Sequence, residues 1–495
     1  MPTERRYSIV LSGTIGGLRS REKECGLCRL LLHALSRNLK DQPDLLSKWD
    51  AEWEAEWLQN SLEYDSVAEG AEDACGSALY PRLKGTSVSS TYGVQLVDDA
   101  ATTKPLRARR MAADLDMMVV KSWVKRCRDE HGPQCADTYL IVAENPIDVP
   151  GFFVIDVLRK RLTPLPPCAE YIALSYVWGR TNFVTTTLSN ADLFRSDGAF
   201  DRVKLPATIQ DAMDVTMDLG YRFLWVDALC IVQDDQKTKP RLIANMDAVY
   251  GNAALTIVAA SGTHAAAGFL RNGNCEDNEL GLVAEDILPG FSLAVVPFLD
   301  GELMDCAHAQ RGWTYQEGCL SARCLVFLEG HVYFVCRASV WRKDVMAETS
   351  AFRPFDGANI LGKTASEWPL RRYAEHVQAF TSRQLTYEPD VLNAFAGVQK
   401  AMAKSMNGTK MWQGLPAAAF DWAILWRPPH GTVLRRRPGF PSWSWTGWTG
   451  AVSMAVDSYS VFDQNWLRER TWIEWYIADS DGSLIPIWDE KIDES

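Results

Sequence analysis

The stretch YIALSYVWG at residues 171–179 decides the fold of this chain. Its opening run is apolar except for one serine, which is typical of a strand buried on both faces of a sheet. Two similar runs follow, RFLWVDALCIV at 222–232 and ALTIVAAS at 254–261. Between them, segments 205–221 and 242–253 carry apolar residues at helical spacing. This alternation with short joints predicts an α/β sheet with parallel strands.

Polar residues stand where the first two predicted strands end. Parallel sheets bind ligands beyond the carboxyl ends of their strands, and Ser175, Trp178 and Gly179 occupy that edge. Gly179 would let the backbone approach a ligand and Trp178 offers an aromatic face, although packing against another domain explains Trp178 at least as well. Asp227 follows the second strand, where it could bind ribose hydroxyls or equally cap the next turn.

The segment QRGWTYQEG at 310–318 carries three candidate residues close together. Trp313 and Glu317 are four residues apart, so on a helix they point the same way. An aromatic ring beside a carboxylate can form one wall of a pocket that binds a ring and steers a charge. The structural alternative is a helix glutamate paired with Arg311 or Arg323.

Length and charge limit the functions open to the chain. Its 495 residues suggest two to three domains. The net charge of −12 argues against a nucleic-acid surface, but not against a small anionic ligand. No apolar run approaches the roughly 18–20 residues that span a bilayer, and the N-terminus is a poor signal peptide. With twelve scattered cysteines, we expect a cytoplasmic protein with reduced thiols.

Residue composition and hydrophobic pattern divide the chain into three regions. Residues 1–165 are predicted to be mostly helical, residues 166–338 to form the α/β domain, and residues 339–495 to form a Trp-rich region of mixed α+β structure. The proline-rich segment 163–168 marks the first boundary, because helices are disfavoured there.

Two groups of cysteine and histidine have spacings that metal sites use: Cys25, Cys28 and His33 in the first, and Cys127, His131 and Cys135 in the second. The second group lacks a C-x-x-C pair, and the leucines around the first make a buried helical cysteine pair more natural. No metal site is therefore predicted. Nor do the seven histidines provide a recognisable hydrolase triad.

Five segments in order resemble the fungal heterokaryon incompatibility (HET) domain: YIALSYVWG (171–179), LPATIQDAM (205–213), FLWVDALCIVQDD (223–235), MDAVYGNAALTIVAASG (246–262) and RGWTYQE (311–317). The flanking segments LTYEPDVLNAFAGV (385–398) and FPSWSWTGW (440–448) agree with full-length members. The resemblance implies a role in fungal non-self recognition, a form of innate immunity that leads to growth arrest or cell death.

The HET domain is in turn similar to TIR domains, which have a flavodoxin-like fold and include NAD-cleaving members. This similarity implies NAD glycohydrolase chemistry, with NAD as substrate, no resident cofactor and self-association on activation. A carboxylate can stabilise the oxocarbenium-like centre that forms when nicotinamide leaves. The implied catalytic residue is Glu317, and the implied substrate-binding residues are Ser175, Trp178, Gly179, Asp227, Arg311 and Trp313. The alternative is a non-enzymatic TIR-like module for signalling or interaction.

Overall fold

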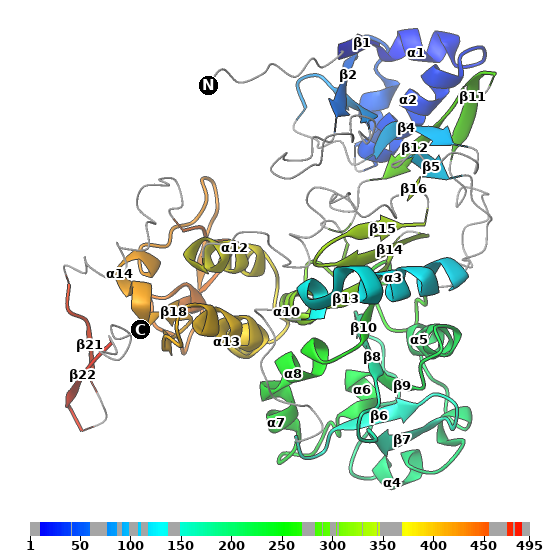
Figure 1. Ribbon diagram of the computed structural model, residues 1–495. Coiled ribbons are helices and arrows are strands. Elements are labelled where there is room, and N and C mark those ends of the chain that lie inside the picture. The colour runs from blue at the N-terminus through cyan, green and yellow to red at the C-terminus, as the bar shows by residue number, and fades with distance from the viewer. Residues whose placement is uncertain are drawn as a thin grey trace. The chain divides into compact units, whose positions relative to one another are not determined.

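The computed structural model describes residues 10–40, 42–59, 77–86, 92–98, 107–109, 117–136, 149–269, 283–289, 291–297, 303, 306–328, 330–343, 345–346, 369–454, 473–478 and 481–487 (Figure 1). The start of the chain, residues 1–9, where a signal peptide was considered, lies outside them. None of the described helices combines the length and the apolar character that crossing a bilayer requires.

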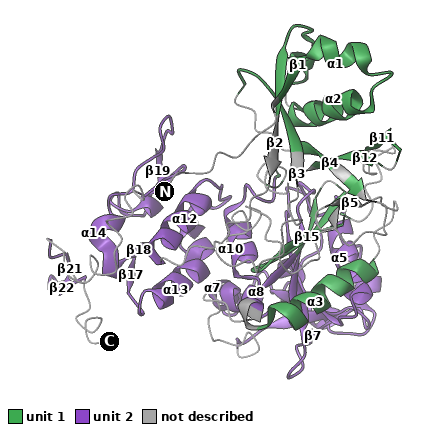
Figure 2. Cartoon of the chain, turned by 45° about the horizontal axis from the view of Figure 1, so that its top comes forward, with its two compact units in different colours: residues 1–132, 269–306, 325–357 green, residues 133–268, 307–324, 358–495 purple. Residues whose placement is uncertain are grey.

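Two compact units make up the chain, and they alternate along the sequence (Figure 2). The segments of unit 1 are Met1–Gly132, Phe269–Cys306 and Leu325–Gly357, and those of unit 2 are Pro133–Gly268, Ala307–Cys324 and Ala358–Ser495. The boundaries expected near 165 and 338 stay predictions of where the family domain begins and ends.

The centre of unit 2 is three parallel strands, as the sequence predicts. Strand β8 (Tyr171–Tyr176) pairs in parallel with β9 (Phe223–Trp225) and with β10 (Leu255–Ala259). Every residue of these strands is buried, which explains their unbroken apolar character. Helix α5 (Ala207–Asp218) joins β8 to β9. The helix expected at 242–253 is two short ones on either side of Asn245, which ends one and begins the next.

The strand order places a ligand-binding edge at the end of β8. Strand β8 lies between β9 and β10, so successive connections lead to opposite sides of it. Such a switch point opens a crevice at the carboxyl ends of the strands. Beyond β9 the sheet continues with antiparallel strands β6 (Phe153–Asp156) and β7 (Arg161–Pro164). The architecture is therefore mixed α/β, with three parallel strands at the centre of unit 2.

The other described α-helices of unit 2 are α4 (Ala191–Phe194), α6 (Asp227–Cys230), α7 (Lys239–Ala244), α8 (Met246–Gly251), α10 (Gly312–Leu320), α12 (Pro369–Thr381), α13 (Ala396–Ser405) and α14 (Phe420–Ala423). Three short antiparallel strand pairs join β17 (Met411–Trp412) to β18 (Leu415–Pro416), β19 (Arg435–Arg436) to β20 (Trp448–Thr449) and β21 (Tyr476–Ala478) to β22 (Leu484–Pro486). Short 3-10 turns complete the described part of the unit. Helix α10 packs against α8 and α13: Gly397 N donates to Gln316 Oε1 (2.7 Å). A Cβ on Gly397 would lie 2.6 Å from Leu320 Cδ1, so only glycine allows this approach.

Unit 1 is built on a mainly antiparallel sheet, in which β4 and β5 pair in parallel. Its described strands are β1 (Val10–Thr14), β2 (Glu52–Gln59), β3 (Ser77–Leu83), β4 (Tyr92–Asp98), β5 (Arg107–Arg109), β11 (Ala284–Leu288), β12 (Phe291–Pro297), β13 (Arg323–Leu328, its first two residues in unit 2), β14 (His331–Cys336), β15 (Val340–Arg342) and β16 (Val345–Met346). Its helices are α1 (Ile15–Arg21), α2 (Gly26–Asn38) and α3 (Met117–Ala136).

The prediction of a mostly helical N-terminal region is wrong, because five of those strands lie before residue 110. The segment EWEAEWLQ at 52–59 forms β2. Trp53 and Ala55 are buried, while Glu52 is exposed and Glu54, between the two buried residues, is half-buried. This is the two-residue period of a half-buried strand, which the high glutamate content concealed.

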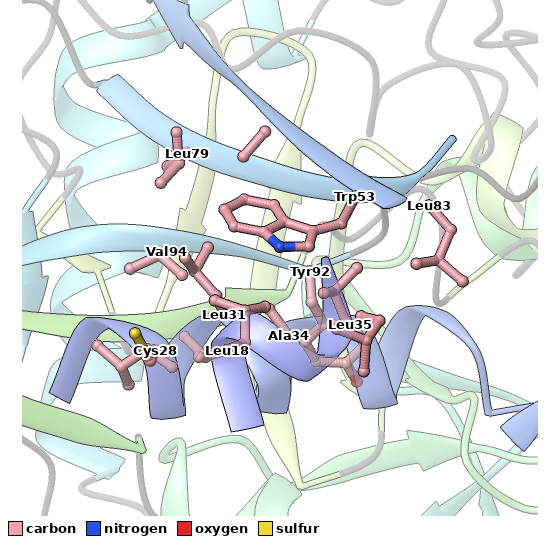
Figure 3. Packing of buried hydrophobic residues seen from close by; sticks show 14 of the residues in the cluster. Leu18, Cys28, Leu31, Ala34, Leu35, Trp53, Leu79, Leu83, Tyr92 and Val94 are labelled. Atoms are coloured by element: carbon pink, nitrogen blue, oxygen red, sulfur yellow. The ribbon is translucent and has the colours of Figure 1, made fainter. Parts of the chain in front are cut away.

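The apolar face of α2 packs on this sheet, and Cys28 belongs to that core (Figure 3). Leu31 and Leu35 pack with it against Trp53 and neighbouring strand residues. Cys25 caps the helix, accepting the Cys28 backbone N–H at 3.3 Å. Burial raises the pKa of the Cys28 thiol to about 11, which disfavours the thiolate that a metal needs. The structure therefore favours the buried helical pair over a metal site here.

Candidate active site

Three buried polar side chains of unit 2 meet at the end of β8. Ser175 Oγ lies 2.7 Å from His308 Nε2 and donates to Glu317 Oε2. The Ser175 hydroxyl has one proton, so when it donates to Glu317 its oxygen accepts the Nε2–H of His308. The order is thus histidine, serine, carboxylate. In a nucleophilic triad the histidine stands between the other two, so this arrangement does not activate Ser175 as a nucleophile.

Burial controls the charges of this trio. It raises the pKa of Glu317 to about 7, an effect that the Ser175 hydrogen bond opposes and the charge of Asp227 reinforces. Burial, with the charges of Arg383 and Arg311, lowers the pKa of His308 to about 3, so the imidazole is neutral near pH 7. A neutral histidine and a carboxyl that titrates near neutral pH allow proton exchange within the trio.

A second carboxylate, Asp227, stands beside the first at the start of α6. Its Oδ2 accepts the Trp178 indole N–H at 2.9 Å and its Oδ1 accepts the Ala228 N–H at 2.7 Å. Burial raises the pKa of Asp227 to about 6. Asp227 is the first residue of α6, whose N-cap is Val226 and makes no side-chain capping bond. The capping role and the ribose contact both stay predictions. Two neighbouring carboxyls with raised pKa values are typical of a functional site.

Arg311 and Tyr176 complete the polar surroundings. Arg311 Nη1 donates to the Tyr176 backbone oxygen at 3.0 Å, and its charge lowers the pKa of both Glu317 and Asp227. The Tyr176 hydroxyl is buried and interacts with the Asp227 carboxyl, whose pKa it lowers. Burial, reinforced by the nearby charge of Asp227, raises the pKa of Tyr176 above the ordinary value. A buried hydroxyl of this kind can donate a hydrogen bond to a ligand oxygen or accept one from a ligand hydroxyl.

Trp313 and Gly179, which were predicted to bind substrate, make contacts outside the group of Ser175, His308 and Glu317. Trp313 is only partly buried, and it forms a hydrogen bond with Asp390 of the C-terminal segment. Gly179 has φ +72°, and a Cβ there would lie 2.3 Å from the Cβ of His264. Its close approach is therefore to the segment around residue 264, and this packing accounts for the glycine without a ligand.

Gly179→Ala should destabilise unit 2 by about 1–2 kcal/mol, since alanine is strained at positive φ and its methyl group displaces His264. Thermal unfolding measures the loss. Gly220→Ala is the control for the backbone contribution alone, because Gly220 has φ +87° but a Cβ there meets nothing within 4 Å. Equal losses in both variants would contradict the packing explanation.

Sequence inspection did not select His308 or Tyr250. His308 lies in a segment without helical or strand periodicity, and its partner Ser175 is 133 residues away. Tyr250, on α8, donates to the Leu174 backbone oxygen at 3.1 Å and interacts with Glu317, yet its spacing marked it only as a core residue. No local signal identifies either of them.

Comparison with known proteins supports the resemblance. Residues 171–317 match the family model described as heterokaryon incompatibility protein (HET). The chain is also similar to Heterokaryon incompatibility protein 6, OR allele, of Neurospora crassa, with 33% identity over 101 residues. That match covers 19% of this chain and 15% of the relative. No solved structure matches. The chain contains a HET domain, and that domain includes both carboxylates of the site.

Proposed function

We propose that this HET-domain protein acts in fungal heterokaryon incompatibility, in the cytoplasm, by cleaving NAD at the site around Glu317. The incompatibility role is supported by the family match and by the name of the Neurospora crassa relative. The chemistry is supported chiefly by one observation: Glu317 and Asp227, both with raised pKa values, lie at the switch point of a parallel sheet. Growth arrest or cell death would follow from loss of NAD.

The proposed step breaks the bond between nicotinamide and ribose. The bonding electrons leave with the nicotinamide nitrogen, and water then adds at the ribose carbon and releases one proton, giving nicotinamide and ADP-ribose. The Glu317 carboxylate faces the developing positive charge. Ser175 and His308 would orient that carboxylate, while Asp227 and the Tyr176 hydroxyl would bind ribose hydroxyls.

Access to Glu317 determines when the site can work. Its side chain is 8% exposed, so the conformation described here presents little of the carboxylate to a substrate. We infer that activation opens the site through self-association, which would expose Glu317 to the substrate. The same burial favours the alternative, in which the domain is a non-enzymatic signalling module and Glu317 stabilises its interior.

A direct assay separates the two functions. Purified full-length chain is incubated with NAD, and free nicotinamide and ADP-ribose are quantified over time. Equal formation of both products, absent from heat-denatured protein, supports the enzyme. NAD that stays intact at all protein concentrations and after enforced dimerisation supports the signalling module.

Enforced dimerisation should raise NAD loss per chain. The chain is fused to a ligand-inducible dimerisation domain, and turnover is measured with and without the inducer. We expect an increase of at least about tenfold, since association would have to favour an open state that is scarce in the monomer. Activity per chain that stays flat across concentration and inducer would contradict association as the trigger.

A further inference from the structure

Helix α3 and the end of strand β14 bring together cysteine and histidine side chains far apart in the sequence. Cys127 and His131 are four residues apart on one face of α3. Cys135 follows after Gly132, whose non-helical backbone (φ +41°) interrupts the helix. Cys336 is the last residue of β14. The ligand atoms of these four residues all lie within 4.8 Å of one another.

The distances fit a metal ion of the size of zinc. Cys336 Sγ lies 3.4 Å from His131 Nδ1. Tetrahedral zinc with bonds of about 2.3 Å to sulfur and about 2.0–2.1 Å to nitrogen separates its ligand atoms by roughly 3.5–3.8 Å. The group therefore needs to contract by only about 1 Å around an ion. Histidine and cysteine at i, i+4 spacing also match the short spacings of structural zinc sites.

The surroundings hold two of these ligands in orientation. The Ser339 N–H donates to Cys336 Sγ at 3.2 Å, a contact that stabilises a thiolate. The Ser339 hydroxyl lies 3.5 Å from His131 Nε2, so Nε2–H can face Ser339 while Nδ1 faces the sulfur atoms. The Trp341 ring lies 5.3 Å from the imidazole and supplies an apolar wall. Such outer contacts fix the tautomer and direction of metal ligands.

We propose that Cys127, His131, Cys135 and Cys336 bind one structural zinc ion. Binding forms three Zn–S bonds and one Zn–N bond and releases the three thiol protons, which leaves a site with one net negative charge. The three cysteines are at most 1% exposed, and four protein ligands leave no open position for substrate. The zinc therefore ties α3 to β14 and takes no part in the chemistry proposed for Glu317.

The sequence pointed to a different pair. Cys25-x-x-Cys28 has the more familiar spacing, but those thiols belong to the core under α2. Cys336 could not be assigned because it lies 205 residues after His131. This contrast provides a matched control, since Cys28 is a buried cysteine of unit 1, as Cys127 and Cys336 are, that the zinc site does not use.

The test is metal analysis of the full chain purified without added chelator. We expect about one zinc per chain in the wild type and in Cys28→Ser. In Cys127→Ser and Cys336→Ser, zinc should fall to the background of a metal-free protein. Zinc retained by both of these variants, or lost from Cys28→Ser alone, would overturn the assignment.

A second measurement does not depend on the folding of the variants. Wild-type chain is stripped of metal under reducing conditions and titrated with Co²⁺. The proposal requires a one-to-one end point with thiolate-to-cobalt absorption, reversed by Zn²⁺, and a lower melting temperature in the stripped form. Absence of that absorption, or a disulfide between Cys127 and Cys336 in the reduced preparation, would refute it.

Discussion

Glu317→Gln should abolish NAD cleavage while raising stability above pH 7. Glutamine keeps the size of the side chain and can still accept the Ser175 hydroxyl, but it has no charge to face the developing cation. Electrostatic contributions of this kind are worth about 3–4 kcal/mol, or roughly a hundred- to thousand-fold in rate. The nicotinamide-release assay measures this loss at the protein concentration where the wild type is active.

The stability gain follows from the pKa of Glu317. Burial raises it to about 7 from an ordinary value of 4.5. The folded chain thus binds this proton more tightly than the unfolded chain does. The resulting stability is fully present below about pH 4.5 and is lost as the pH rises through about 7. Glutamine has no proton to lose, so at pH 8 the variant should exceed the wild type by about 2–3 kcal/mol.

Unfolding in denaturant at pH 5 and pH 8 separates the explanations. The difference between variant and wild type should grow with pH, while Glu375→Gln on α12, whose carboxylate pairs with Arg371, should change little at either pH. If Glu317 instead stabilises the fold as a carboxylate, its replacement lowers stability at pH 8. A variant that is less stable and still cleaves NAD would assign the residue a structural role.

The parallel part of the fold could be predicted because each buried strand carries its own signal. Strands β8, β9 and β10 are apolar on both faces, and the helical segments between them leave only a parallel arrangement. The antiparallel strands of unit 1 could not be recognised in the same way. In the part of β2 whose burial is described, Trp53 and Ala55 are buried while Glu52 and Glu54 are not, so the glutamates hide the two-residue period.

Only the site residues near the ends of predicted strands could be predicted from the sequence. Ser175 and Asp227 follow apolar strands, and the sheet rule places them at one edge. The contact between Ser175 and Glu317 spans 142 residues, and nothing local in the sequence encodes it. The histidine contact is equally remote. A sequence motif also does not reveal how deeply its residues are buried. The spacing of Trp313 and Glu317 predicted one pocket wall, but Glu317 is buried beside Ser175 and Trp313 forms a hydrogen bond with Asp390.

Lys400→Met should cost about 3 kcal/mol of stability, because it leaves a buried carboxylate without its counter-charge. Lys400 Nζ lies 3.1 Å from both carboxylate oxygens of Asp247, whose side chain is 2% exposed. The ammonium also donates to the Ala244 backbone oxygen at 3.2 Å, at the end of α7. Methionine keeps an unbranched apolar stem and removes only the charge and its hydrogen bonds.

Two further variants show whether the loss comes from this pair. Lys404→Met, at an exposed position of the same helix, should change stability by less than about 0.5 kcal/mol. Adding Asp247→Asn to Lys400→Met removes the unpaired charge and should recover about half of the loss. Equal melting temperatures for Lys400→Met and Lys404→Met would show that water replaces the ammonium, which is itself 40% exposed.

The same pair connects the C-terminal segment to the candidate site. Helix α13 contacts α8 through Lys400 and α10 through Gly397, and α10 carries Glu317. The segment that matches the HET family ends at residue 317, before α13 begins. Helices beyond the family segment therefore cover the inner face of α10, where Gln316 and Leu320 are buried. Lys400→Met should consequently lower the melting temperature yet leave NAD turnover near the wild-type rate at temperatures where the chain stays folded.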